Sequence, residues 1–89
     1  MAFKVLLHPK AAKTLEKIDE KNKVRIKEAL KELCSSPEKG GKQLRLSDFW
    51  SLRIGDYRAI YEIDRDKNQV LVLFLGHRKN VYDDFTKML

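Results

Sequence analysis

The chain has 89 residues, a mass of 10.5 kDa and 43% hydrophobic residues, which is enough for one small core. We therefore expect a single domain over residues 1–89, with any chemistry on a surface or in a shallow groove, because so small a core cannot enclose a drug-sized cavity. The 19 Lys and Arg outnumber the 13 Asp and Glu, and the net charge of +6 favours a large acidic partner, either nucleic acid or an acidic protein segment.

Cysteine usage and hydropathy exclude several classes of protein. A single cysteine, Cys34, cannot form a disulfide within the chain, and with two histidines it cannot build a zinc site of the CxxC type. The longest apolar run, Val70–Leu75, is far shorter than the roughly 20 residues of a membrane span. We expect a cytoplasmic protein without a metal, a cofactor or contact with a membrane.

The N-terminal half predicts one strand and two helices. Alternation predicts a strand over residues 3–7, and Pro9 suits the first turn of a helix that runs to Ile18. Residues 18–22 supply cap-type side chains between the helices. The second helix has an apolar stripe and ends at the Ser-Ser-Pro and Gly-Gly segments; the stripe consists of Ile26, Ala29, Leu30, Leu33 and Cys34.

The second half predicts a hairpin whose register is fixed by a two-residue turn, Gly55-Asp56. This register places Ile54 opposite Tyr57 and Arg53 opposite Arg58. One face of the hairpin carries apolar side chains and should receive the helices: Trp50, Leu52, Ile54, Tyr57, Ala59, Tyr61 and Ile63. The other face carries Arg53, Arg58 and Glu62.

The last predicted strand, Val70–Leu75, is apolar throughout, as a central strand is, and should stop at Gly76. Apolar residues at helical spacing over 80–89 predict a short terminal helix. The expected fold is α+β, in the order β-α-α-β-β-β-α: a mainly antiparallel four-stranded sheet with an N-terminal helical hairpin on one face, a cationic groove on the other and a short C-terminal helix.

Two features carry candidate chemistry. Like charges opposite each other on a sheet repel, so the Arg53/Arg58 pair is a candidate phosphate site, unless Glu62, Asp48 or Asp56 neutralises it. The second feature is the cationic segment His77-Arg78-Lys79, followed by Tyr82, which could stack on an unpaired base. His77 could move a proton near neutral pH. Alternatively, His77 caps the strand end, Lys79 is solvated and Tyr82 packs on the sheet.

Together these segments resemble the RelE/ParE superfamily of toxins from toxin–antitoxin systems, over nearly the whole chain. The resemblance is carried by W-x-L-R-x-G-x-Y-R-x-x-Y over residues 50–61 and by Lys10, Ala11, Leu15 and Lys42-Gln43-Leu44. The motif H-R-x-x-x-Y over residues 77–82 favours the RelE branch. The resemblance implies a metal-independent endoribonuclease that cuts mRNA in the ribosomal A site by attack of a ribose 2′-hydroxyl on the adjacent phosphate. It also implies a RelB-like antitoxin as partner.

The resemblance assigns roles to individual residues. Arg58 would stabilise the scissile phosphate, Arg78 would protonate or stabilise the leaving group, and Tyr82 would stack on the target nucleotide or activate the attacking hydroxyl. Typical RelE toxins carry a pair of strand lysines near the positions of Ser51 and Arg53. Because arginine is a poor base, the general base would be His77 or Tyr82. The expected RNA-backbone contacts are Lys42, Arg45, Arg53 and Lys79.

Two other functions fit the same sequence. One is a ParE-like toxin that binds DNA gyrase and cuts nothing, although gyrase binding has no need of a stacking tyrosine beside two arginines. The other is an RNA-binding relative without catalysis, which the missing lysine pair favours.

Overall fold

The computed structural model describes residues 2–44 and 48–80. Arg45, Tyr82 and the predicted terminal helix from residue 81 onward lie outside the described residues. In chain order the elements are β1 (Lys4–Leu7), α1 (Pro9–Lys17), α2 (Glu20–Glu32), β2 (Lys42–Gln43), β3 (Phe49–Ile54), β4 (Tyr57–Asp64) and β5 (Gln69–His77). None of the helices in these ranges is long and apolar enough to span a membrane.

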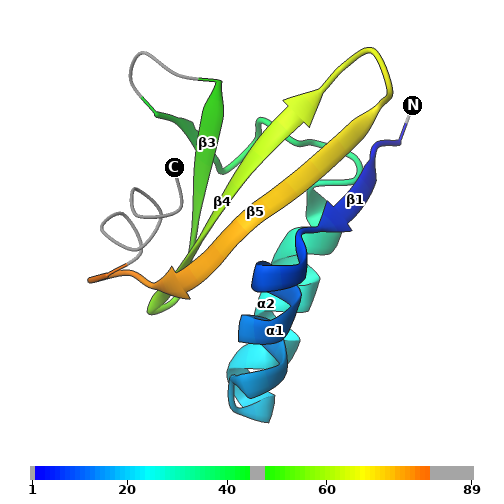
Figure 1. Cartoon of the computed structure of the whole chain (residues 1–89). Helices are drawn as coiled ribbons and strands as arrows, with labels where there is room; N and C mark the ends of the chain where they lie inside the picture. Colours follow the sequence, from blue (N-terminus) through cyan, green and yellow to red (C-terminus); the bar gives the residue numbers. More distant parts are fainter. Residues whose placement is uncertain (1, 45–47, 81–89) are drawn as a thin grey trace.

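The sheet has five strands, in the order β1-β5-β4-β3-β2, and lies beside the two helices (Figure 1). The prediction of a mainly antiparallel sheet is confirmed, because only β1 and β5 pair in parallel. The prediction of four strands is wrong. The additional strand is β2, whose two residues pair with Ser51 and Trp50 of β3 and are too few for a periodic pattern in the sequence.

The hairpin register is as predicted, with Ile54 opposite Tyr57 and Arg53 opposite Arg58. Gly55 has φ +61°, the left-handed conformation that the tight turn requires. The predicted end of the last strand is wrong, because β5 continues through Gly76, which pairs with Arg58, to His77. Glycine weakens a strand but keeps both backbone hydrogen-bonding groups, so the ladder continues through it.

The helices begin at capping residues near the predicted boundaries. The imidazole of His8 accepts a hydrogen bond from the backbone N–H of Lys10 at 3.2 Å, and Pro9 occupies the first turn of α1. The Asp19 carboxylate accepts hydrogen bonds from the side chain and backbone of Asn22 at the start of α2. These bonds lower the pKa of Asp19.

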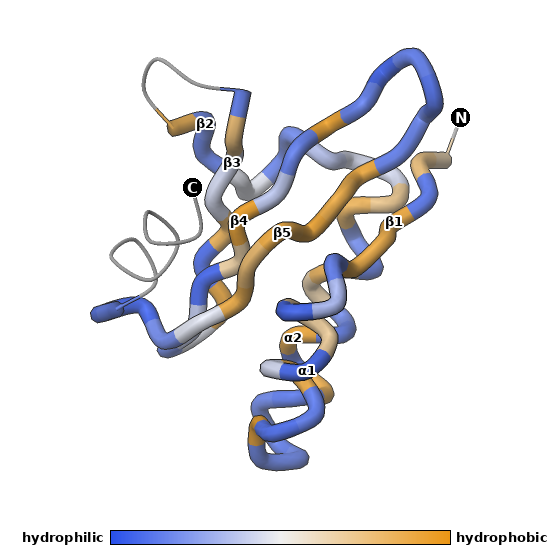
Figure 2. Tube along the Cα trace, in the orientation of Figure 1, coloured by the Kyte–Doolittle hydropathy of each residue, from blue (hydrophilic) through white to orange (hydrophobic). Residues whose placement is uncertain are grey.

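The core lies between the helices and the apolar face of the sheet, where β5 forms a continuous hydrophobic stretch (Figure 2). The prediction of this face is confirmed. Ile54, Ala59 and Tyr61 are buried in the main cluster, and Trp50, Leu52, Tyr57 and Ile63 pack against it. The helices contribute Ala11, Leu15, Ile18, Ile26, Leu30 and Leu33.

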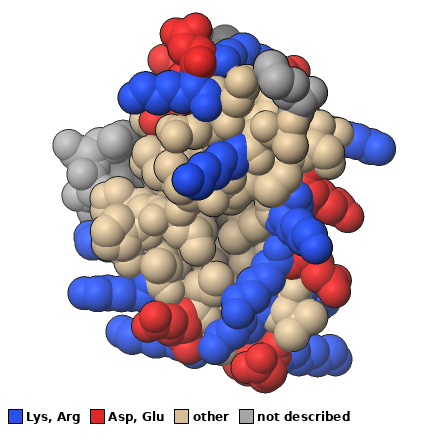
Figure 3. Space-filling model, turned by 90° about the vertical axis from the view of Figure 1, so that its right-hand side faces the viewer, with Lys and Arg blue, Asp and Glu red and all other residues tan. Residues whose placement is uncertain are grey.

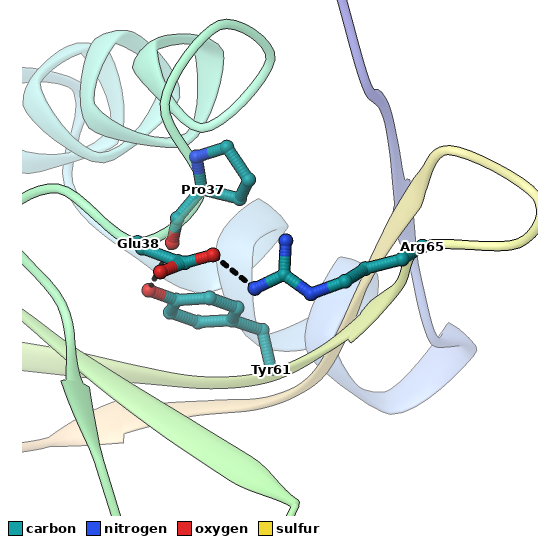
Figure 4. Close-up of polar contacts among 4 residues, drawn as sticks. All are labelled: Pro37, Glu38, Tyr61 and Arg65. Atoms are coloured by element: carbon teal, nitrogen blue, oxygen red, sulfur yellow. Dashed lines mark hydrogen bonds and ion pairs between the residues drawn. The ribbon is translucent and has the colours of Figure 1, made fainter.

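A buried tyrosine anchors the loop between α2 and β2 to the sheet (Figure 4). The Tyr61 hydroxyl donates to the Pro37 carbonyl oxygen at 2.8 Å, and the neighbouring Glu38 forms an ion pair with Arg65. Burial, with a smaller contribution from the charge of Glu38, raises the pKa of Tyr61 to about 12. Gly41 lies beside the hydroxyl end of Tyr61, where any side chain would collide with that hydroxyl. This anchor positions the segment that leads into β2.

Candidate nucleic-acid interface

Three arginines gather around the turn between β3 and β4; we call Arg53, Arg58 and Arg78 the arginine cluster. Arg53 and Arg58 are direct partners across β3 and β4, on the face opposite the helices. Their guanidinium groups are drawn apart by hydrogen bonds. Arg53 Nε donates to the Gly55 carbonyl oxygen at 3.2 Å, toward the turn, and Arg58 donates to the Ser51 hydroxyl at 3.1 Å, away from it.

Arg78 joins this face through the register of β5. Gly76 pairs with Arg58, and the Arg78 backbone N–H donates to the Asp56 carbonyl oxygen at 2.7 Å, which extends the same ladder by one step. Because side chains alternate along a strand, Arg78 lies on the face of Gly76 and Arg58. Its Nε is 3.6 Å from the Asp56 carboxylate, and the Arg78 side chain remains 41% exposed. Asp56 therefore orients Arg78 without covering it.

Ser51 is a functional candidate that the sequence analysis did not identify. It is only 2% exposed and supports the partly buried Arg58 by accepting its hydrogen bond. Ser51 is two residues before Arg53, so it lies on the same face of β3 and diagonal to Arg58 across the hairpin. The predicted hairpin register was therefore sufficient to place Ser51 beside Arg58. Lys42 is the direct partner of Ser51 in β2 and is exposed on that same face. The structure therefore places Lys42 on the same sheet face as the arginine cluster.

His77 is not brought together with the arginines. It pairs with Tyr57, whose ring packs against the core on the helix side, and the two rings meet edge to face at 5.9 Å between centroids. The Nδ1 atom of His77 accepts a hydrogen bond from the Lys79 backbone N–H at 3.3 Å. Lys79 is exposed in the turn after β5. His77 thus faces away from Arg58 and Arg78 and holds the turn that follows them.

The face opposite the helices is not uniformly cationic, which corrects the prediction of a cationic groove along it. Its middle is an apolar cluster of Ile60 with Leu44, Phe49, Leu73 and Phe74. At the end of the sheet away from the arginine cluster, an open hollow of about 640 Å³ reaches onto the helix side, where Trp50 and Ile63 line it. Its walls carry the carboxylates Glu38, Asp48, Glu62, Asp64 and Asp66, with Arg65 among them. Among the described residues of the sheet, those at the end that carries the β3–β4 turn therefore favour a polyanion most.

The charge on the rest of the surface is mixed. On the side seen in Figure 3, Lys and Arg side chains occupy several separate places, with Asp and Glu between them. In the arginine cluster, Asp56 forms an ion pair with Arg78 and leaves its side chain partly exposed. Within residues 2–44 and 48–80, no three His, Cys, Asp or Glu side chains group to hold a metal ion.

This geometry suits the recognition of phosphate. Guanidinium groups stay charged, donate hydrogen bonds in a planar fork and match phosphate oxygens in pairs. Arg53 and Arg58 are fixed by the backbone pairing of β3 with β4, and Arg78, directly after β5, is fixed by its backbone hydrogen bond to Asp56. The charges are therefore in place before a ligand arrives.

Comparison with known proteins gives a consistent family. Residues 5–82 match the family described as ParE toxin of type II toxin–antitoxin system, parDE. The chain is 38% identical over 56 residues to Toxin RelG of Mycobacterium tuberculosis, an alignment that spans 61% of this chain and 64% of that protein, less than two thirds of its length.

Solved structures agree. The fold is similar to that in the RelBE2 toxin–antitoxin complex of Mycobacterium tuberculosis, with a TM-score of 0.80 and 30% identity over 88% of this chain and 93% of the other. A mutant of E. coli toxin RelE in the free state gives a TM-score of 0.80 with 26% identity, over 100% of this chain and 99% of the other. The resemblance in the sequence motifs is thereby confirmed, and the chain belongs to the RelE/ParE superfamily of type II toxin–antitoxin toxins.

Proposed function

We propose that this toxin is a metal-independent endoribonuclease that cuts mRNA in the ribosomal A site. The observation that carries the proposal is the arginine cluster: three cations on one face, from β3, β4 and the residue directly after β5, two of them exposed and one held by Ser51. Likeness to RelE toxins supports it. As an enzyme of the cytoplasm, it would be held inactive by a RelB-like antitoxin, as expected from the solved complex of its relative.

In the proposed reaction, the ribose 2′-hydroxyl attacks the adjacent phosphorus while the bond to the next nucleotide's 5′-oxygen breaks. The products are a 2′,3′-cyclic phosphate and a 5′-hydroxyl end. Arg58 would stabilise the extra negative charge on the phosphate, and Arg78 would stabilise or protonate the leaving oxygen. Removing one preorganised charge of this kind typically lowers a rate by two to three orders of magnitude.

The base that accepts the proton from the 2′-hydroxyl is assigned to Tyr82 in preference to His77. His77 lies against Tyr57 on the helix side of the sheet, so its ring cannot approach a phosphate held by Arg58 without leaving that contact. Tyr82 follows Arg78 by four residues and lies outside the described residues. Lys42, Arg53 and Lys79 would contact the RNA backbone, and Arg45, also outside the described residues, is proposed for the same role.

Mapping RNA ends tests this function. Brief induction in growing bacteria should produce new 5′-hydroxyl ends inside translated reading frames, and an Arg58→Ala variant of equal abundance should produce none. A parent protein that arrests growth without such ends would contradict the proposal. Altered DNA supercoiling in that case would indicate the gyrase-binding alternative. This alternative is retained because the matching family is described as ParE toxin. RNA binding without cleavage would indicate the catalytically impaired relative.

A further inference from the structure

A second group of cations lies on the other side of the β3–β4 turn. There α2 approaches the end of β3, and an open hollow of about 290 Å³ separates them. The helix contributes Arg25, Glu28, Ala29 and Glu32 to its walls, and the turn contributes Arg53 and Gly55. We call this the turn hollow. Arg25 belongs to no motif in the sequence, so only the fold brings it to the arginine cluster.

Both arginines of the turn hollow lie beside Gly55. The three guanidinium atoms Nη1, Cζ and Nη2 of Arg25 lie 3.3, 3.5 and 3.5 Å from the position that a Cβ on Gly55 would occupy. Near-equal distances mean that the flat face of the group is turned toward the glycine. Arg53 donates only its Nε to the Gly55 carbonyl oxygen. Arg25 and Arg53 are both exposed residues, so their remaining N–H groups are accessible to a ligand.

Neither arginine forms an ion pair within 4 Å with a carboxylate of the described residues. Glu28 and Glu32 line the helix wall, and their charges moderate the potential in the hollow without contacting either guanidinium group at that distance. Two guanidinium groups beside one glycine repel each other, and an anion between them would remove that cost. A phosphodiester group offers two oxygens to such a pair of forks.

We propose that Arg25 and Arg53 form a second phosphate subsite, which binds the RNA backbone next to the proposed cleavage site. Arg53 belongs to both the arginine cluster and the turn hollow, so an RNA strand on the sheet face would continue around the Gly55-Asp56 turn onto the α2 side. This inference rests on the proposed function. The phosphate comes either from the mRNA or from ribosomal RNA, because both present the same group.

The test compares affinities for RNA at several salt concentrations. One arm uses a single-stranded oligonucleotide with 2′-O-methyl riboses, which cannot be cleaved, and the other uses ribosomes carrying an mRNA modified in the same way in the A site. Arg25→Ala should weaken binding roughly tenfold and lower the slope of log affinity against log salt by about 0.7–1. A defect in both arms identifies an mRNA phosphate, and a defect on ribosomes alone identifies ribosomal RNA.

Two further variants make the outcome decisive. Lys27→Ala removes the same charge from an exposed residue of α2 that does not line the hollow, and should leave binding within twofold of the parent. Glu28→Gln removes a negative charge from the hollow and should tighten binding. If Arg25→Ala behaves like Lys27→Ala in both arms, the subsite is refuted. If the subsite is refuted in this way but Arg58→Ala still abolishes cleavage, the proposed function remains supported. If the parent protein neither binds nor cuts RNA, both the subsite and the proposed function are refuted.

Discussion

Arg53 and Arg58 are direct partners across a hairpin, yet their guanidinium groups form hydrogen bonds in opposite directions along the sheet. This divergence relieves the repulsion of two like charges that the register places side by side. Arg53 is exposed beside the turn, and Arg58 is partly buried against Ser51. The pair is therefore tolerated in the folded protein.

Arg78→Ala should abolish growth arrest and lower the rate of RNA cleavage by two to three orders of magnitude, because it removes a preorganised charge. Its ion pair with Asp56 joins side chains that are 41% and 71% exposed, so its loss should change the free energy of unfolding by less than about 1 kcal/mol. Growth assays and thermal melting measure the two effects. Asp56→Asn is the matched control, since it breaks the same ion pair and keeps the cation. Undiminished arrest by Arg78→Ala would remove this residue from the site.

Anion binding to the arginine cluster should appear as thermal stabilisation. Sulfate at ten times its dissociation constant stabilises a one-site protein by about 1.4 kcal/mol, which is several degrees in Tm for a domain of this size. The shift should be clearly smaller in Arg58→Ala and intermediate in Arg58→Lys, which keeps the charge but loses the fork. Equal shifts in all three proteins would show that sulfate acts on the solvent or at another site.

Tyr61→Phe should destabilise the fold by about 1–3 kcal/mol, because it leaves the buried Pro37 carbonyl oxygen without its donor. The pKa of Tyr61 is raised from 10.0 to about 12, so the folded state favours the neutral phenol. This contribution is complete below pH 10 and is lost as the pH rises through about 12. Denaturant unfolding at pH 8 and at alkaline pH measures it. The parent should lose more stability over that range than Tyr61→Phe, and identical losses would contradict the assignment.

Gly41→Ala should destabilise the protein because its Cβ would collide with the Tyr61 hydroxyl and lie 3.2 Å from the ring carbon that bears it. The two residues should be energetically coupled. In a Tyr61→Phe background the same substitution should cost less, since the oxygen is gone and only the tight ring contact remains. A double-mutant cycle from denaturant titrations measures this coupling. Additive effects would place the strain elsewhere.

The parts of the fold that local chemistry determines were predicted from the sequence. The Gly55-Asp56 turn fixes the hairpin register, and with it the Arg53/Arg58 pair, because a two-residue loop permits one alignment. The parallel pairing of β1 with β5 joins segments more than sixty residues apart, and alternation within Lys4–Leu7 does not reveal a partner. The two residues of β2 show no period at all.

In the candidate site too, local pattern predicts some positions, whereas others depend on tertiary packing. Side chains alternate between the two faces of a sheet, so His77 points to the opposite face from its neighbours Gly76 and Arg78. Its position on the helix side could therefore have been predicted if the strand had been extended past Gly76. The position of Arg25 beside Gly55 could not be predicted from the sequence, because it depends on how α2 packs against β3. Helical periodicity identifies the buried face of α2 but not which exposed residue borders the turn.

Association with the antitoxin should depend on salt. A protein of net charge +6 with an exposed arginine cluster attracts an acidic, partly disordered chain over a distance, and screening by salt weakens that attraction. The protein encoded next to this toxin should copurify with it, rescue growth and associate more slowly as salt rises from about 0.05 to 0.5 M, over which the Debye length shortens roughly threefold. Stopped-flow or surface-binding measurements give the rates, and Arg58→Ala should show a shallower salt dependence than the parent. A neighbouring protein that neither copurifies nor rescues growth would remove the partner assignment, whereas tight binding at a salt-independent rate would refute only its electrostatic component.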